Sequence, residues 1–398
     1  MRTISISLTR SVRLPDSRSL ARHRRAPDLG PRLLFFSGGT ALRGLAQRLI
    51  DYTHNSIHLI TPFDSGGSSA EIRKAFRMLS VGDLRNRLMA LADHSIHGQP
   101  EVFRLFSFRF PDDELQPRLR RWLAKMIRGE DHMVAAISEP MRQIVRQHLR
   151  FFHEQMPAGF DLRGANIGNL ILAGGYLNQD RDIDSVVYLF SKLVEVRGVV
   201  RPITDENLHL VAELEDGEVV VGQHRLTGKE EAPPDSPIQR LFLSQGGRDP
   251  SPYVLDLREK IRRLIESADL ICYPMGSFYS SLLVNLLPRG IGRAVAALDA
   301  PKVYVPNTGR DPEQLGLSLA VRIERLLDAL REGEEEELPT ERLLSHVLVD
   351  AAGAGWQASD LAAVAQLGVR VIDTPLTRRT TAPMIDAERL AQVLVSMA

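Results

Sequence analysis

The chain has 398 residues, of which 43% are hydrophobic and 25% are charged, a balance typical of a folded globular protein rather than a disordered or fibrous one. Lys and Arg together number 50, as do Asp and Glu, so no overall charge favours nucleic acid or a membrane surface as a partner. The single cysteine, Cys272, excludes an internal disulfide framework.

The N-terminal 30 residues are interpreted as a basic lead-in, because they contain seven arginines and include a short strand pattern, ISISL. A solvated segment is one interpretation of these arginines, and a contact with a partner or a lipid is the other. No apolar run approaches the roughly 18 to 20 residues that a membrane helix needs, and the lead-in lacks the apolar core of a secretory signal. We therefore expect a cytoplasmic protein.

Six short runs rich in β-branched and aromatic residues predict strands that are buried on both faces. In chain order they are RLLFFS (32–37), SIHLITPF (56–63), ADLICYPM (268–275), KVYVPN (302–307), SHVLVDA (345–351) and VRVIDT (369–374). Helical patterns follow them, and this alternation predicts an α/β fold with a doubly wound, mostly parallel sheet. We assign residues 31–110 and 158–398 to this domain.

Two segments depart from the alternation. Residues 111–157 have helical periodicity and many arginines, which predicts a helical insertion at the rim of the sheet. Residues 208–226 alternate apolar and polar side chains around Asp216-Gly217, a pair typical of a β-hairpin turn. We expect this hairpin to form a small antiparallel appendage.

Glycine and hydroxyl residues follow four of the predicted strands, at the sheet edge where ligands bind in such folds. The turn Gly38-Gly39-Thr40 precedes a helical pattern, so its amide groups could bind phosphate. A tight turn with no ligand explains this motif equally well, because it matches neither the P-loop nor the GxGxxG pattern.

The stretch TPFDSGGSS (61–69) places Asp64 directly before a glycine-serine loop. Ser68 and Glu71 have the spacing of a helix capping box, but such a cap does not account for Asp64. A carboxylate at this position could hold Mg²⁺ against phosphate oxygens or accept a proton from an attacking hydroxyl. The alternative is a solvated turn aspartate. The loop residues that we expect to bind phosphate are Gly66, Gly67, Ser68 and Ser69.

Three further motifs, VGDLRNRL (81–88), GANIGNLILAGGY (164–176) and GSFYSS (276–281), are candidates for nucleotide binding. In VGDLRNRL (81–88), Asp83 is the expected helix cap, and an arginine in the first turn of a helix is unfavourable with the helix dipole unless an anion is present. Asn166 and Asn169 surround Gly168 at a helix start, where they could read a base or sugar, or cap the helix. The residues of these motifs are Asp83, Arg85, Asn86, Asn166, Gly168, Asn169, Gly276, Ser277, Tyr279 and Ser280.

Taken in order, these motifs resemble the family of 2-phospho-L-lactate transferases (CofD) and their YvcK-type relatives, the gluconeogenesis-factor proteins. The resemblance covers residues 31–375 and rests on GGTALRGL, TPFDSGGSS, GDLRNRL, the GN helix, ADLICYPMGSFYSS and KVYVPN. The segments FFSGGTALRGL and VGDLRNRL are similar to those of a CofD-related branch that is associated with a kinase-like neighbour, the GAK system. HExxH, GxSxG and EF-hand patterns are absent from the sequence.

The resemblance implies a Rossmann-like fold and two alternative functions. A transferase would move a phosphoryl-linked group from a nucleoside-diphosphate derivative to an acceptor hydroxyl, assisted by Mg²⁺ held by Asp64, which would also be the catalytic residue. A YvcK-like relative would instead bind a nucleotide-sugar without catalysis and act as a regulator. The resemblance further implies a kinase-like protein partner and a homodimer. Relatives commonly have two adjacent aspartates where this chain has Asp64-Ser65, which favours the second alternative.

Overall fold

The computed structural model describes residues 11, 13–93, 98–228, 231–246, 250–380 and 382–398. The strand expected within ISISL lies outside these residues. The described part of the lead-in forms helix α1 (Ser17–Arg25), which begins where the Asp16 carboxylate accepts a hydrogen bond from the amide of Arg18 at 3.0 Å. A 3₁₀ turn, η1 (Pro27–Leu29), leads from α1 to the first strand.

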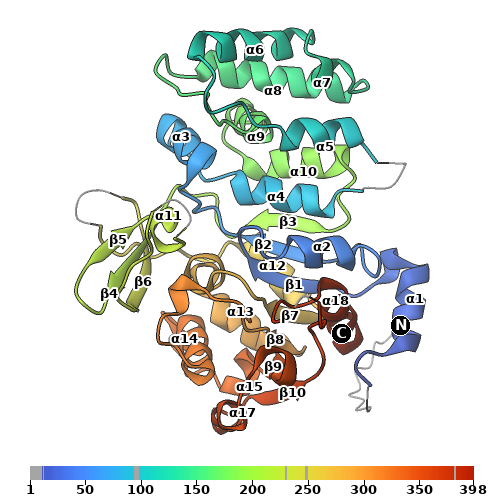
Figure 1. The fold of residues 1–398 in the computed structure, drawn as a ribbon, viewed down its shortest axis with the longest axis vertical. Helices are drawn as coiled ribbons and strands as arrows, with labels where there is room; N and C mark the ends of the chain where they lie inside the picture. The colour runs from blue at the N-terminus through green and yellow to red at the C-terminus, as the bar shows by residue number, and fades with distance from the viewer. Residues whose placement is uncertain (1–10, 12, 94–97, 229–230, 247–249, 381) are drawn as a thin grey trace.

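The centre of the molecule is a parallel seven-stranded sheet with the order β10-β9-β8-β7-β1-β2-β3 (Figure 1). All six predicted strands occur in it, and the fold class is confirmed. The short strand β3 was not predicted. The strands are β1 (Leu33–Ser37), β2 (Ile57–Ile60), β3 (Val199–Pro202), β7 (Leu270–Tyr273), β8 (Lys302–Tyr304), β9 (His346–Val349) and β10 (Arg370–Asp373).

Both faces of the sheet are covered by helices, as expected of a doubly wound fold. On β1, Leu33 and Phe35 pack into a cluster with residues of α2 (Arg43–Leu49) and α18 (Ala387–Met397). Leu34 and Phe36 point to the opposite face and pack with the remaining C-terminal helices. These helices are α12 (Glu259–Glu266), α13 (Ile291–Ala297), α14 (Leu319–Arg331), α15 (Thr340–Leu343) and α17 (Ala358–Gln366), with the short α16 (Ala351–Ala354) following β9.

Strand β1 lies where the strand order reverses. The chain leaves β1 for β2 on one side and later enters β7 on the other. In open α/β sheets, ligands bind in the crevice beyond the carboxyl ends of the strands at such a switch point. The fold therefore places the loops after β1 and β7 at the expected ligand site.

All described helices between β2 and β3 gather into one layer with its own buried cluster, at the top of Figure 1. The predicted insertion at 111–157 contains three of them, and its boundaries as a separate domain remain a prediction. The helices are α3 (Gly67–Phe76), α4 (Gly82–Leu91), α5 (Pro100–Ser107), α6 (Gln116–Arg128), α7 (His132–Ala135), α8 (Met141–Gln155), α9 (Ile167–Asn178) and α10 (Ile183–Leu193).

The predicted hairpin is present as β4 (His209–Leu214) and β5 (Val219–Val221), which pair antiparallel around Gly217 in a left-handed conformation. Two features differ from the expectation. A third strand, β6 (Ile238–Ser244), pairs with β4, and the end of the predicted hairpin is the helix α11 (Gln223–Leu226). Gly222, at φ 101°, makes this change of direction sterically possible. The small sheet packs against the large one through a shared apolar cluster.

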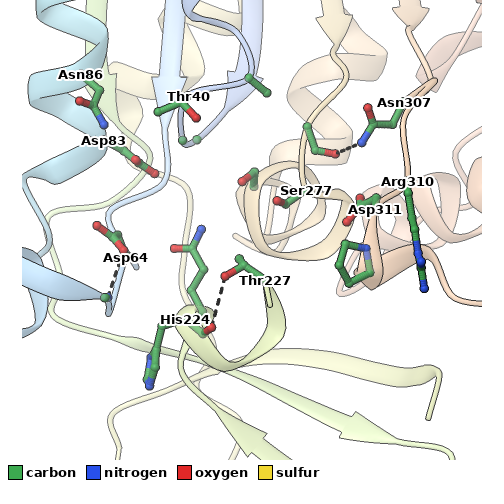
Figure 2. A pocket seen from close by; sticks show the side chains of 18 residues that line it. Thr40, Asp64, Asp83, Asn86, His224, Thr227, Ser277, Asn307, Arg310 and Asp311 are labelled. Carbon is green, nitrogen blue, oxygen red and sulfur yellow. Dashed lines mark hydrogen bonds between the residues drawn. The ribbon is translucent and has the colours of Figure 1, made fainter. Parts of the chain in front are cut away.

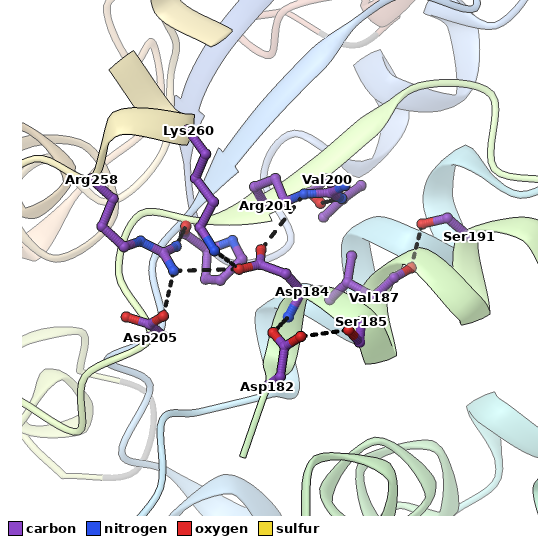
Figure 3. Close-up of polar contacts among 11 residues, drawn as sticks. Asp182, Asp184, Ser185, Val187, Ser191, Val200, Arg201, Asp205, Arg258 and Lys260 are labelled. Carbon is purple, nitrogen blue, oxygen red and sulfur yellow. Dashed lines mark hydrogen bonds and ion pairs between the residues drawn. The ribbon is translucent and has the colours of Figure 1, made fainter. Parts of the chain in front are cut away.

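An ion-pair network ties the helical layer to the sheet (Figure 3). Asp184, at the start of α10, pairs with Arg258 at 3.4 Å, with Arg201 of β3 at 3.6 Å and with Lys260 of α12. Arg258 also pairs with Asp205 at 2.6 Å. One partly buried carboxylate therefore neutralises cations from several elements. No described helix has the length and apolar character needed to cross a bilayer.

Candidate functional site

A cavity of about 500 Å³ lies at the carboxyl ends of β1 and β7 (Figure 2). We call it the switch-point cavity. Nine of the predicted site residues line it, although four different segments of the sequence supply them. They are Gly38, Gly39, Thr40, Asp64, Gly66, Asp83, Asn86, Gly276 and Ser277.

Gly38 brings the first loop against the cavity floor. A Cβ atom at this position would lie 2.7 Å from Thr61 Oγ1, 3.1 Å from Asp83 Oδ2 and 3.2 Å from Ser281 Oγ. Gly39 adopts φ 43°, a region that favours glycine. The two glycines thus let the turn after β1 approach the polar side chains, and Thr40 is left facing the cavity.

Two carboxylates line the cavity on the side of the helical layer (Figure 2). Asp64 follows β2, and its Oδ1 accepts a hydrogen bond from the amide of Gly66 at 3.2 Å. Asp83 lies in the first turn of α4 and accepts hydrogen bonds from the Thr61 hydroxyl at 3.2 Å and from the Gly39 amide. Burial and, next, the negative charge of Asp64 together raise the pKa of Asp83 to about 6. The two carboxylates are therefore close enough to repel each other.

Gly82 allows the start of α4 to lie close to Asp64, since a Cβ at this position would lie 2.9 Å from Asp64 Oδ2 and 2.5 Å from Ser69 Oγ. The expectation that Asp83 caps α4 is wrong. The capping position is Val81, without a side-chain hydrogen bond, and Asp83 is turned towards the cavity instead (Figure 2).

The donor set fits Mg²⁺ only in part. Mg²⁺ is usually held by one or two carboxylates together with substrate phosphates and water. Asp64 and Asp83 would supply two carboxylates, and their mutual repulsion would be relieved by a cation. Within the described part of the chain, no group of three or more His, Cys, Asp and Glu side chains could hold a metal ion by itself. The residues thus suit a cation that arrives with a phosphorylated ligand.

Residue 65 does not add a third oxygen ligand to the cavity. The Ser65 hydroxyl bonds the Nδ1 atom of His224 at 2.8 Å, and it accepts a hydrogen bond from the His224 amide at 3.3 Å. This serine therefore ties the loop after β2 to α11 of the small sheet. The second carboxylate near Asp64 comes from Asp83, which is distant in sequence.

Sequence reasoning did not select nine other residues that line the cavity. They are Ala41, Gln223, His224, Thr227, Ser281, Asn307, Arg310, Asp311 and Pro312. Two of them had a usable signal, because Ser281 ends the GSFYSS motif and Asn307 ends a predicted strand. Gln223 is buried, and its Oε1 has no hydrogen-bond partner among the described residues. Arg310 brings a positive charge to the wall opposite Asp64 (Figure 2).

The first three amides of η2 (Phe278–Leu282), the π-helical turn that follows the loop after β7, are occupied by carboxylates of the protein itself. Glu313 Oε2 accepts hydrogen bonds from the amides of Tyr279 at 2.8 Å and Ser280 at 2.9 Å, and Asp311 accepts from Phe278 at 3.0 Å. These carboxylates hold the loop that contains Arg310 against η2. Tyr279 and Ser280, predicted to bind nucleotide, therefore lie outside the cavity.

The side chains of Ser68 and Asn166, near α9, have structural partners, whereas the buried Oδ1 of Asn169 has no hydrogen-bond partner among the described residues. Ser68 is no capping residue, because α3 begins after Gly66 without a side-chain cap; its hydroxyl accepts a hydrogen bond from the Asn166 amide at 3.2 Å. Asn166 caps α9 by accepting from the Asn169 amide at 3.0 Å. Gly67, Ser68, Ser69, Asn166 and Asn169 are all absent from the cavity wall.

Arg85 faces a smaller cavity of about 150 Å³ that adjoins the first. We call it the arginine cavity. It is lined by Arg43, Arg85 and Arg87, and it shares Gly39, Thr40 and Asn86 with the switch-point cavity. Gly168 has a packing role here, since a Cβ would lie 2.6 Å from the Phe106 carbonyl and 2.8 Å from Arg85 Cδ.

Comparison with known proteins finds similarity over most of the chain. The family model described as 2-phospho-L-lactate transferase CofD matches residues 33–377. The gluconeogenesis factor of Bacillus subtilis is 29% identical over 380 residues, covering 92% of this chain and 98% of that protein. The gluconeogenesis factor of Listeria monocytogenes is 30% identical over 283 residues, 70% of this chain and 66% of that protein. A crystal structure of a UPF0052 family member from Bacillus halodurans has a TM-score of 0.63 at 24% identity, covering 92% and 99% of the two chains.

Proposed function

The chain belongs to the CofD family, and on that premise we propose that it binds a nucleoside-diphosphate-linked substrate in the switch-point cavity and transfers its phosphoryl-linked group to an acceptor hydroxyl. One observation carries the proposal. Asp64 and Asp83 converge beside the glycine turn after β1, at the point of the sheet where α/β folds bind ligands. A mere tight turn would not require two mutually repelling carboxylates there.

The charges in the cavity support a bound cation. Asp64, Asp83 and Asp311 line it, and Arg310 is the arginine among its lining residues. A diphosphate would add negative charge to this set, so its binding requires a counter-charge. Asp64 and Asp83 would hold Mg²⁺, which would neutralise charge on the diphosphate oxygens. Arg310 would contact the diphosphate from the opposite wall.

The proposed transfer can be written as one balanced step in which these residues take part. The acceptor oxygen forms a bond to the β-phosphorus, and the bond from that phosphorus to the oxygen bridging to the α-phosphate breaks. The nucleoside monophosphate leaves with the electron pair. The proton of the acceptor hydroxyl passes to the carboxylate of Asp64, which also orients the hydroxyl for attack. The backbone of the glycine turn and the Thr40 hydroxyl position the phosphates.

Ligand binding and turnover test the proposal separately. We expect GDP or UDP derivatives with Mg²⁺ to raise the melting temperature, because a ligand that binds only the folded state stabilises it by mass action. Asp64→Asn should abolish turnover while leaving nucleotide binding within about tenfold. Asp51→Asn, an exposed neutralisation outside the cavity, is the matched control. Full turnover by Asp64→Asn would remove this residue from the mechanism.

A second candidate is a nucleotide-sugar-binding regulator without catalysis. It is favoured by the engagement of Ser65 with His224, which removes this position from any metal site, and by the similarity to gluconeogenesis factors over nearly the whole chain. Recovery of an intact UDP-sugar after incubation with protein, Mg²⁺ and candidate acceptors would support the regulator. Release of nucleoside monophosphate would support the transferase.

A further inference from the structure

The arginine cavity holds positive charge that the chain does not neutralise directly. Arg43 is the first residue of α2, and Arg85 and Arg87 lie on α4. Within the described ranges, no carboxylate lies within ion-pairing distance, 4.0 Å, of any of these three guanidinium groups. Arg43 is exposed, whereas the other two are held by the fold.

Arg85 has a hydrogen-bond donor without an acceptor. Its Nη2 donates to Asn86 Oδ1 at 2.5 Å, while its Nη1 is buried and unpartnered among the described residues. Burial, together with the neighbouring charges of Arg109 and Arg43, lowers the pKa of Arg85 to about 10. The group stays charged at neutral pH. Asp83 and Asp64 attract it from beyond ion-pairing distance, so among the described residues no carboxylate pairs directly with this buried cationic donor beside the cavity.

Arg87 repeats this pattern at a more buried position. Only 2% of its surface is exposed, and its Nη1 is fixed by a hydrogen bond to the Leu42 carbonyl at 3.1 Å. Its Nε is buried and has no partner in the described part of the chain. Leaving a buried donor unpaired typically costs about 1–3 kcal/mol, so two such donors around one cavity indicate a missing acceptor.

The cavity has room for that acceptor. A volume of about 150 Å³ is well above the roughly 10–15 Å³ that one water molecule needs, so the cavity has room for one oxyanion group. Gly168 contributes to this space by leaving the stem of Arg85 unobstructed. The shared wall at Thr40 and Asn86, both visible in Figure 2, joins this space to the switch-point cavity.

We propose that the arginine cavity is a second anion site, which binds a phosphate or carboxylate group of the acceptor substrate beside the nucleotide-linked ligand. The guanidinium fork matches the geometry of both oxyanions, and the unpaired N–H groups of Arg85 and Arg87 would donate to them. The inference rests on the proposed function for the identity of the ligand as acceptor. The existence of the anion site does not depend on it.

Titration calorimetry with inorganic phosphate tests the site at constant ionic strength, with acetate in a parallel titration to separate a preference for phosphate from one for carboxylate. We expect Arg85→Met to weaken anion binding at least tenfold and Arg43→Gln severalfold. Arg48→Gln, an exposed arginine of the same helix as Arg43, is the matched control and should change binding less than twofold. If Arg85→Met does not fold, the exposed Arg43→Gln decides the question.

The second arm measures phosphate binding in the presence of GDP or UDP with Mg²⁺. Phosphate that still binds to the nucleotide-saturated protein supports a separate site. The proposal is overturned if wild-type protein binds neither anion, if both variants bind as well as wild type, or if nucleotide displaces phosphate and both variants lose the two ligands in equal proportion. Arginine-dependent phosphate binding without any nucleotide binding would uphold the anion site and reject the nucleotide-linked substrate.

Discussion

Replacing Glu313 with glutamine should stabilise the protein at alkaline pH. Glu313 is buried, and burial together with the charge of Asp311 raises its pKa to about 7. Its Oε2 accepts from two backbone amides, and its Oε1 contacts the Ser280 hydroxyl at 2.5 Å. A glutamine can keep this arrangement, because its oxygen accepts from the amides and its NH₂ group donates to Ser280 Oγ.

The magnitude follows from linkage between protonation and folding. The pKa of Glu313 is 4.5 ordinarily and about 7 in the folded protein, so the folded state holds its proton more tightly. The contribution of Glu313 to the free energy of unfolding is therefore greatest below pH 4.5. It declines as the pH rises and levels off above about pH 7. At about 1.4 kcal/mol per pKa unit, the total loss is about 3 kcal/mol.

Urea unfolding of wild type and Glu313→Gln at pH 5, 6, 7 and 8 measures this effect. The variant should gain up to about 3 kcal/mol over wild type at pH 8 and progressively less towards pH 5, since it cannot ionise. Glu336→Gln, at an exposed position between α14 and α15, controls for the loss of one negative charge. An offset between variant and wild type that is the same at every pH would refute the reasoning.

Three further substitutions give distinct results. Gly38→Ala should abolish nucleotide-induced stabilisation, because its Cβ would lie 3.1 Å from Asp83 Oδ2. If nucleotide raises the melting temperature of this variant as much as that of wild type, the turn after β1 accommodates the added methyl group and the expectation is wrong. Asp184→Asn should lower the free energy of unfolding by about 2 kcal/mol, since Arg258 is largely buried and loses one of its carboxylate partners, and denaturation that matches wild type would contradict this. Ser68→Ala should cost about 1 kcal/mol of stability for its one hydrogen bond and leave nucleotide affinity unchanged, whereas a loss of affinity in calorimetry would return this serine to the binding site.

Local sequence patterns were sufficient for the elements of the sheet. The strands β1, β2, β7, β8 and β9 are short apolar runs, and burial on both faces makes such runs distinctive. β10 was predicted from a similar run, but it is an edge strand whose residues are exposed or half-buried. The β3 strand escaped prediction because its buried residues alternate with half-buried ones at the sheet edge. The β6 strand lies beyond a polar, proline-rich loop, and it is ordered by pairing with β4 rather than by its own pattern.

The sequence by itself determined the fold class and the loops at the strand ends, and the family followed from the order of those motifs. Only the tertiary structure decided which residues of each loop line the switch-point cavity. It brought Asp83 beside Asp64 and directed Ser65 to His224. It also paired the amides of Tyr279 and Ser280 with Glu313. These outcomes depend on contacts between residues far apart in the chain, whose partners are specified by packing and not by local periodicity.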